Sequence, residues 1–159
     1  MNKLAEHRRI RFESIEDCLA EVERILEAAR EGRLQAIGNW TPGQILAHIA
    51  SWIEYAYVGF PMKPAPAFLR WILRLRLGKM LESDMSRGVK IPGVKAGTTG
   101  MDEMETSEAG ARLVAALKRL ASSEDAPYPS PAFGRLTHEQ RIKLNLRHAE
   151  LHLGYLIYE

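Results

Sequence analysis

Two histidines four residues apart are the clearest chemical signal in the sequence. His148 and His152 stand within residues 137–156, where apolar side chains recur every three or four positions. In a helix, residues four apart project about 40° from each other and lie one turn apart. Two imidazoles placed in this way can bind one metal ion. The alternative is that each ring donates a hydrogen bond inside a helical core.

The residues around this pair exclude one class of metal enzyme. Zincin metalloproteases carry His-Glu-x-x-His, in which the glutamate is the general base. Here Ala149 follows His148, and Glu150 is two residues further on, about 200° around the helix. Glu150 therefore cannot reach the same ion as His148, and a third ligand must come from another element.

A third histidine stands in a segment with a clear helix start. Thr41 and Gln44 form a capping box, and Pro42 suits the first helical position. His48 shares the inner apolar stripe of this helix with Ile45. A lone inward histidine is usually a hydrogen-bonded core residue, so His48 becomes a candidate ligand only if it faces the other two histidines.

Helices must position these side chains, and the hydrophobic periodicity predicts five of them. The predicted helices are residues 14–30, 41–58, 68–78, 107–121 and 137–156, the third being short. No segment alternates with period two, so we expect no sheet. The fold class is all-α: a four-helix bundle with a short extra helix and a long irregular crossing at residues 79–105. A loop of this length is either a lid or pocket wall, or a mobile connection.

Several other side chains have both a functional and a structural interpretation. Cys18 is a reactive thiol, a metal ligand or a small buried core residue, and its place beside an apolar stripe favours the core. Arg70 and Arg74 suit an anionic ligand, a membrane surface or a solvated helix face, and the solvated face is favoured. Tyr55 and Tyr155 share the faces of His48 and His148, where they orient a water or fill the core, and core packing is favoured.

The composition limits the class of protein. The chain has 159 residues, 46% hydrophobic and 26% charged, which suits one globular domain over residues 1–159. A formal net charge of only +2 argues against a nucleic-acid partner. No apolar stretch is long enough to span a membrane, and the first nine residues lack the apolar run of a signal peptide. With one cysteine and no internal disulfide, we expect a cytoplasmic protein, with a homodimer through an apolar bundle face as an option.

Two segments resemble the DinB-like (DinB/YfiT) superfamily of metal-dependent bacterial proteins, which includes hydrolases and thiol-dependent transferases. Residues 39–48 resemble its tryptophan, capped helix start and single histidine, and His148-x-x-x-His152 resembles its final pair. Residues 131–137 look like a little-characterised branch of the superfamily. The resemblance runs from about Ile10 onward and implies that His48, His148 and His152 are three metal ligands in a helical bundle.

The chain departs from the branch pattern at two places. Branch members often carry histidines where this sequence has Ser130 and Leu151. Neither place belongs to the three-histidine set, so the implied metal site is retained. An accessory proton donor at these two places is not expected.

Three neutral imidazoles would leave a divalent ion with its full charge and an open position, as in catalytic zinc sites. A bound water would become a nucleophile, or a thiol would be held as thiolate. Imidazole accepts zinc, nickel, iron or copper, so the sequence does not identify the ion. We therefore expect a divalent-metal-binding protein acting on a small-molecule or thiol substrate, as a metal-dependent hydrolase or a thiol S-transferase. The alternative is a non-catalytic helical-bundle module that binds a partner or is structural.

Overall fold

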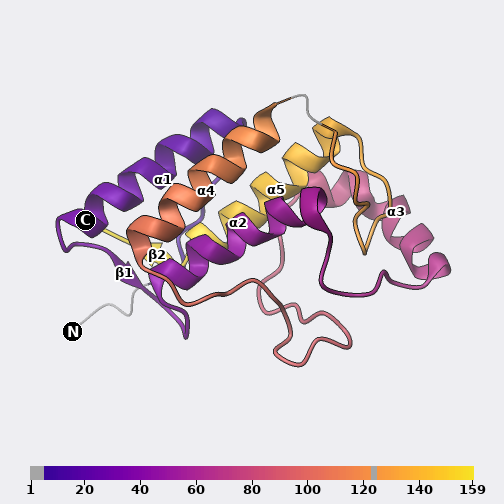
Figure 1. The fold of residues 1–159 in the computed structure, drawn as a ribbon, viewed down its shortest axis with the longest axis horizontal. Helices are drawn as coiled ribbons and strands as arrows, with labels where there is room; N and C mark the ends of the chain where they lie inside the picture. The colour runs from indigo at the N-terminus through magenta and orange to yellow at the C-terminus, as the bar shows by residue number, and fades with distance from the viewer. Residues whose placement is uncertain (1–5, 123–124) are drawn as a thin grey trace.

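The computed structural model describes residues 6–122 and 125–159, which form five helices and a pair of very short strands (Figure 1). In chain order the elements are α1 (Ile15–Arg30), β1 (Gln35–Ala36), α2 (Pro42–Val58), α3 (Ala67–Glu82), α4 (Thr106–Ala121), α5 (His138–Leu153) and β2 (Leu156–Ile157). The all-α fold class is confirmed. The expectation about a signal peptide falls partly on residues 1–5, which lie outside the described residues.

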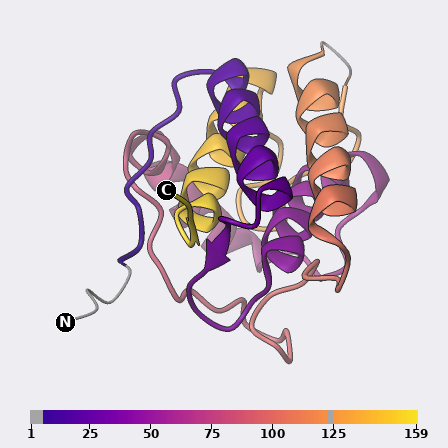
Figure 2. The same cartoon turned by 90° about the vertical axis from the view of Figure 1, so that its left-hand side faces the viewer.

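Helices α1, α2, α4 and α5 form the bundle (Figure 2). Helices α2 and α1 each pack against both α4 and α5, so the four helices surround one apolar core. The largest fully buried side chains of the core come from all four helices: Ile25, Ile45, Leu46, Ile49, Ile53, Leu113, Leu117, Leu120, Leu146 and Leu153. Cys18 belongs to this core, as its structural interpretation predicted.

The helix starts follow the local sequence. The Thr41 side chain accepts a hydrogen bond from the Gln44 backbone, and the Gln44 side chain accepts one from the Thr41 backbone. Thr137 and Gln140 form the same reciprocal pair at the start of α5. Each cap is worth about 1 kcal/mol of stability. Both predicted capping boxes are confirmed.

Two predictions about the C-terminal segment are wrong. The last helix ends at Leu153 rather than at residue 156, and the chain then enters β2. Strand β2 pairs antiparallel with β1, so a small sheet exists, although two residues per strand are too few to show alternation in sequence. Gly154 is the residue directly after the helix. A side chain would not fit there, because a Cβ at Gly154 would lie 2.4 Å from the ring of His7. The N-terminal segment thus crosses closely over the end of α5.

The prediction of a short third helix is also wrong, since α3 has 16 residues like most of the others. Its later turns are buried at Leu77 and Leu81, which pack with Phe133 in a second apolar cluster. These tertiary contacts keep the helix continuous beyond Gly78. Helix α3 lies at one end of the bundle, against α5 (Figure 1).

The irregular crossing occupies residues 83–105 and returns the chain from α3 to α4. It is held against α2 at Gly100, where φ is +82° and a Cβ would lie 2.6 Å from the Cβ of Ser51. Only glycine fits both the backbone conformation and the close approach. None of the described helices combines the length and apolar character that a membrane span needs.

Candidate metal centre

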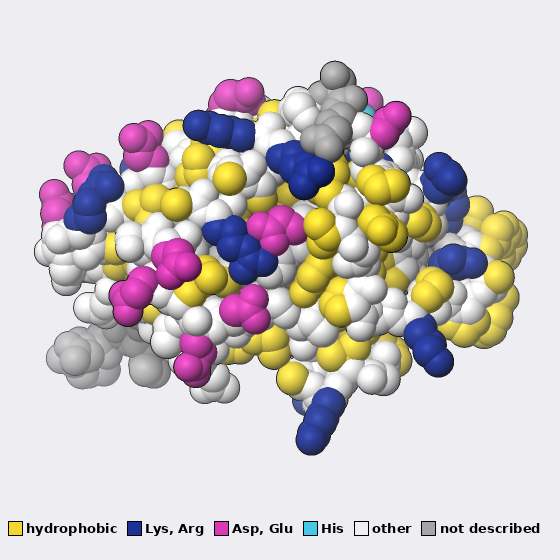
Figure 3. All heavy atoms as spheres, in the orientation of Figure 1, with side chains coloured by type: hydrophobic (Ala, Val, Ile, Leu, Met, Phe, Trp, Pro, Cys, Tyr) yellow, Lys and Arg dark blue, Asp and Glu magenta, His cyan; other side chains and the backbone are white. Residues whose placement is uncertain are grey.

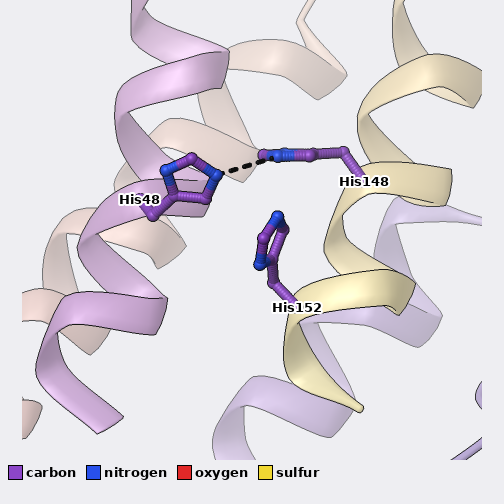
Figure 4. Close-up of side chains that lie close together, drawn as sticks. All are labelled: His48, His148 and His152. Atoms are coloured by element: carbon purple, nitrogen blue, oxygen red, sulfur yellow. Dashed lines mark hydrogen bonds between the residues drawn. The ribbon is translucent and has the colours of Figure 1, made fainter. Parts of the chain in front are cut away.

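The three predicted histidines converge between α2 and α5 (Figure 4). Each ring offers one nitrogen, and these nitrogens all lie within 4.8 Å of one another. The Nε2 atoms of His48 and His148 are 3.1 Å apart. Nitrogens bound to one tetrahedral zinc ion lie about 3.3 Å apart, so small ring movements would place all three at coordinating distance.

Helical geometry explains the convergence. His148 and His152 stand one turn apart on α5, with ring centroids 4.6 Å apart. His48 comes from the facing surface of α2, and its ring centroid lies 4.4 Å from that of His152. Helices α2 and α5 pack directly against each other. The condition set by the sequence for His48, that it must face the other two histidines, is met.

The proton position on His48 is fixed by the crossing loop. Nδ1 of His48 lies 2.7 Å from the backbone oxygen of Thr99. A carbonyl oxygen only accepts, so Nδ1 carries the proton and Nε2 presents its lone pair to the centre. The indole Nε1 of Trp52 donates to the same oxygen at 3.3 Å, and the Tyr55 hydroxyl lies 3.2 Å from Oγ1 of Thr99.

Thr99 is therefore a residue of the candidate centre that the sequence did not indicate. Its contribution is a backbone oxygen, and no side-chain pattern identifies one. The position of Thr99 also supports the pocket-wall interpretation of the crossing loop, since Thr98 and Thr99 line the cavity at the histidines. Tyr55 supports Thr99 through its hydroxyl, which is a more specific role than filling the core.

Burial keeps all three rings neutral. It lowers the pKa of His48 to about 4, with the hydrogen bond to Thr99 acting in the opposite direction. It lowers the pKa of His152 to about 3, aided by His48 and His7. The pKa of His148 is well below its ordinary value, first through burial and then through the neighbouring His152 and His48. Neutral imidazole is the form that binds a metal, so near pH 7 no proton has to leave these rings first.

His148 has one buried polar atom that the protein does not satisfy. Its Nδ1 is buried and has no hydrogen-bond partner among the described residues. Because Nε2 of His48 is unprotonated, Nε2 of His148 donates the hydrogen bond between these two atoms, which leaves Nδ1 of His148 as its unprotonated nitrogen. An ion bound by Nε2 of His148 would therefore require the ring proton to move to Nδ1, which no described protein group opposes.

Aromatic side chains surround the histidines. The ring of Trp40 stacks on His152 with centroids 5.6 Å apart and planes inclined by 13°. The ring centroid of Trp52 lies 5.7 Å from that of His148. These flat apolar surfaces limit ring rotation and exclude water from part of the centre. Trp40 stands in a segment that carries the resemblance, but no pattern in the sequence places it against a histidine of another helix.

The centre opens into a large groove. Its volume is about 2390 Å³, and its walls include α2, α3, α5 and the loops around residues 83–99 and 125–136. Single-ligand pockets are usually smaller, about 300–1,000 Å³. Apolar side chains that line it include Trp40, Trp52, Phe60, Leu73, Leu144 and Leu151. The three histidines thus lie within reach of a ligand that enters the groove.

The remaining predicted residues have supporting positions. Tyr155 lines the groove, and its ring packs edge-on against His7 with centroids 4.6 Å apart. Leu151 and Ser130 both line the groove, and the Ser130 hydroxyl accepts backbone hydrogen bonds that close the turn at residues 130–134. Glu150 is absent from the three-histidine cluster, as its place on the helix predicted. The pKa of Cys18 rises to about 12, mainly through burial, so its thiol stays protonated.

A comparison with protein families gives one match. The family described as Protein of unknown function (DUF1569) matches residues 4–158, nearly the whole chain. This family is part of the DinB-like fold superfamily, which agrees with the resemblance of the two histidine segments, although the comparison does not name the DinB/YfiT group itself. Neither the curated proteins nor the solved structures gave a significant match.

Proposed function

Because the chain belongs to the DUF1569 family and brings three neutral histidines together, we propose that it is a divalent-metal protein that acts on a small molecule. His48, His148 and His152 would hold the ion. The observation that carries the proposal is that their nitrogens lie within 4.8 Å of one another beside an open groove. A structural ion needs no groove, which favours a catalytic role over a non-catalytic bundle module.

The residues present fit a borderline-soft divalent ion such as zinc, nickel or iron(II). When bound, such an ion would supply positive charge that lowers the pKa of a water or thiol beside it. The chain's own contribution is to hold His48 in one tautomer through Thr99, to keep the three rings unprotonated by burial, and to exclude bulk water with Trp40.

The lack of a carboxylate among the possible ligands favours thiol transfer over hydrolysis. The cluster of possible ligands contains three histidines and no carboxylate among the described residues. Hydrolysis usually draws on a positioned general base. A thiol held by a metal is deprotonated by the ion itself, so S-transfer needs no such base. We therefore rank a thiol S-transferase first and a hydrolase second.

The groove also indicates the kind of substrate. Its charged lining is mainly basic and includes Lys63, Arg76, Lys79, Lys90, Arg135 and Arg141, with Asp84 and Asp125 as the acids among the described residues. A low-molecular-weight thiol that carries carboxylates would be attracted to this lining. The apolar walls would receive the electrophilic partner. In the reaction the sulfur forms a bond to carbon, the leaving group departs with the bonding electrons, and the thiol proton passes to solvent.

The first experiment is to measure the metal content of protein purified without a histidine tag. We expect about one equivalent of metal in the wild type and its loss in His148→Ala, because two imidazoles bind an ion much less tightly than three. His138→Ala is the matched control, since His138 lies in the same helix outside the cluster. A wild type that stays metal-free after incubation with zinc, nickel and iron(II) would refute the proposal.

The second experiment separates the two reactions. The metal-loaded protein is given an aryl halide with and without cysteine or glutathione, and separately a nitrophenyl ester. Thiol conjugation that depends on His148 supports the transferase, whereas thiol-independent ester cleavage supports the hydrolase. Metal binding with neither activity would support the non-catalytic alternative.

A further inference from the structure

Helix α3 carries a row of apolar side chains on the outside of the molecule. Among the described residues, nine large hydrophobic side chains are exposed, and six of them are on α3. They are Phe68, Leu69, Trp71, Ile72, Leu75 and Met80, with Phe68 and Leu75 exposed by 69% and 68%. Large apolar patches are rare on monomeric proteins unless they contact a partner or a membrane. The prediction of a solvated face for this helix is therefore incomplete, because that face also exposes large apolar side chains.

Two opposite sides of α3 are apolar. The inner side consists of Leu73, Leu77 and Leu81, which pack in the cluster with Phe133 and Leu144. At 100° per residue, Phe68, Trp71, Ile72 and Leu75 all project away from that inner side. The bundle needs only the inner side. The outer side, which we call the α3 outer face (Phe68, Trp71, Ile72 and Leu75), has no packing role among the described residues.

Basic residues border the α3 outer face. Arg76 and Lys79 are exposed on the same helix, and Arg74 donates to the backbone oxygens of Phe133 and Arg135 at the helix base. On the face seen in Figure 3, hydrophobic and basic side chains gather at the end where α3 lies, while acidic side chains gather toward the opposite end. Trp, Phe and Leu bordered by Lys and Arg are typical of helices that lie in a membrane interface.

The sequence around α3 is also rich in positive charge. Residues 63–95 contain eight Lys or Arg and two Asp or Glu, a net +6, whereas the whole chain is +2, so the rest is −4. Both acids in this segment already pair with bases outside it. Glu82 lies 3.2 Å from Lys143, and Asp84 lies 3.0 Å from Arg9. Within the part of the chain that the structure describes, Arg76 and Lys79 beside the α3 outer face form no ion pair with a carboxylate.

From these observations we infer that the α3 outer face binds the surface of an anionic lipid bilayer, with α3 lying along it. An anionic bilayer supplies what this surface lacks: apolar depth for Trp71 and Leu75, and negative charge for Arg76 and Lys79. A second copy of the chain would bring two equally basic faces together, which is unfavourable. The inference does not depend on the three histidines, although Arg76 and Lys79 also line the groove beside them.

The test is sedimentation of the full-length protein with vesicles of phosphatidylcholine alone or of equimolar phosphatidylcholine and phosphatidylglycerol. We expect binding to the anionic vesicles, little binding to the neutral ones, and a decrease as salt rises. Trp71 is 64% exposed, so its emission should shift to shorter wavelength on the anionic vesicles.

Matched variants separate the apolar and charged contributions. Leu75→Ser should lower the vesicle partition coefficient about tenfold. Val58→Ser is its control, since Val58 is 66% exposed but lies on α2. Lys79→Ser should lower the coefficient about fivefold, whereas Lys118→Ser on α4 should leave it unchanged. All four positions are exposed, so each variant should keep the wild-type unfolding temperature.

Two results would overturn the inference. One is equal binding, or none, to neutral and anionic vesicles. The other is a wild-type dimer in light scattering that Leu75→Ser converts to a monomer, which would assign the α3 outer face to self-association. A metal-free protein that still binds anionic vesicles would leave the inference intact even if the proposed function failed.

Discussion

Nδ1 of His48 donates its proton to the backbone oxygen of Thr99, 2.7 Å away, across 51 residues of sequence. This contact joins the bundle to the crossing loop and determines which nitrogen of His48 faces the centre. The side chain of Tyr55, through its contact with Oγ1 of Thr99, supports the same loop position. The loop is thus part of the candidate metal centre, although it supplies none of the three histidines.

Tyr55→Phe should lower metal affinity about tenfold, the lower end of the range for residues that orient a metal ligand. The change removes the hydroxyl that contacts Thr99 and leaves the ring packing unchanged. Zinc affinity measured by competition with a chelating dye checks this. Tyr128→Phe, at an exposed tyrosine, should have no effect. Equal affinities for Tyr55→Phe and wild type would show that the Thr99 side chain does not hold the loop.

Gly100→Ala should weaken both the fold and the metal centre. Its Cβ would lie 2.6 Å from Ser51 and force the loop beside Thr99 away from α2, while the positive φ adds about 1 kcal/mol of strain. Gly93→Ala is the matched control, because Gly93 lies in the same loop with φ +80°, and a Cβ there would meet no atom within 4 Å. We expect Gly93→Ala to cost about 1 kcal/mol of stability and no metal affinity. Urea unfolding and zinc competition measure the two effects, and similar losses of affinity in both variants would contradict the explanation.

Glu150→Gln should reduce the free energy of unfolding by about 3 kcal/mol, because it leaves a buried charge without its partner. The buried charge is that of Arg147, whose guanidinium lies 3.1 Å from Oε1 of Glu150. The same Oε1 accepts a hydrogen bond from the Phe12 backbone at 2.7 Å, and Arg147 donates to the Phe12 oxygen. Together they attach the N-terminal segment to α5. Chemical denaturation checks the value. Glu139→Gln, on an exposed part of the same helix, should change stability by less than about 0.5 kcal/mol.

Cys18 should resist thiol reagents in the native protein and react once the protein unfolds. The pKa of its thiol is raised from the ordinary 9.0 to about 12, so between these values the unfolded state loses a proton that the native state keeps. Stability is therefore fully present below about pH 9 and falls as the pH rises through this window. Urea unfolding at pH 8 and pH 10 tests the sign. In Cys18→Ala the decrease between the two pH values should be smaller, and an equal decrease would assign the effect to other groups.

Much of the bundle could be predicted because its helices carry complete local signals. The caps at Thr41 and Thr137 and the apolar stripes behind them depend on neighbours in sequence, and both starts were located to the residue. The length of α3 could not be predicted in this way. Gly78 suggests a helix end, whereas contacts of Leu77 and Leu81 with Phe133 keep the helix continuous.

The candidate site likewise has parts that the sequence predicts and parts that it does not. The spacing of His148 and His152 predicted their shared face, and the resemblance added His48. Thr99 could not be predicted, because a backbone oxygen in an irregular loop has no sequence pattern and is placed by Gly100 against α2. The pair of β1 and β2 was equally hidden, since two residues per strand are too few to show a period.

The stacking of Trp40 on His152 gives the protein a built-in optical probe. Indole emission is quenched by nearby ions with unpaired electrons, such as copper or many nickel complexes, and much less by closed-shell zinc. Trp40 and Trp52 both lie beside the histidine rings, so a change in emission intensity would indicate which kind of ion had bound, without any label. The indole that would signal metal binding is itself part of the wall of the candidate centre.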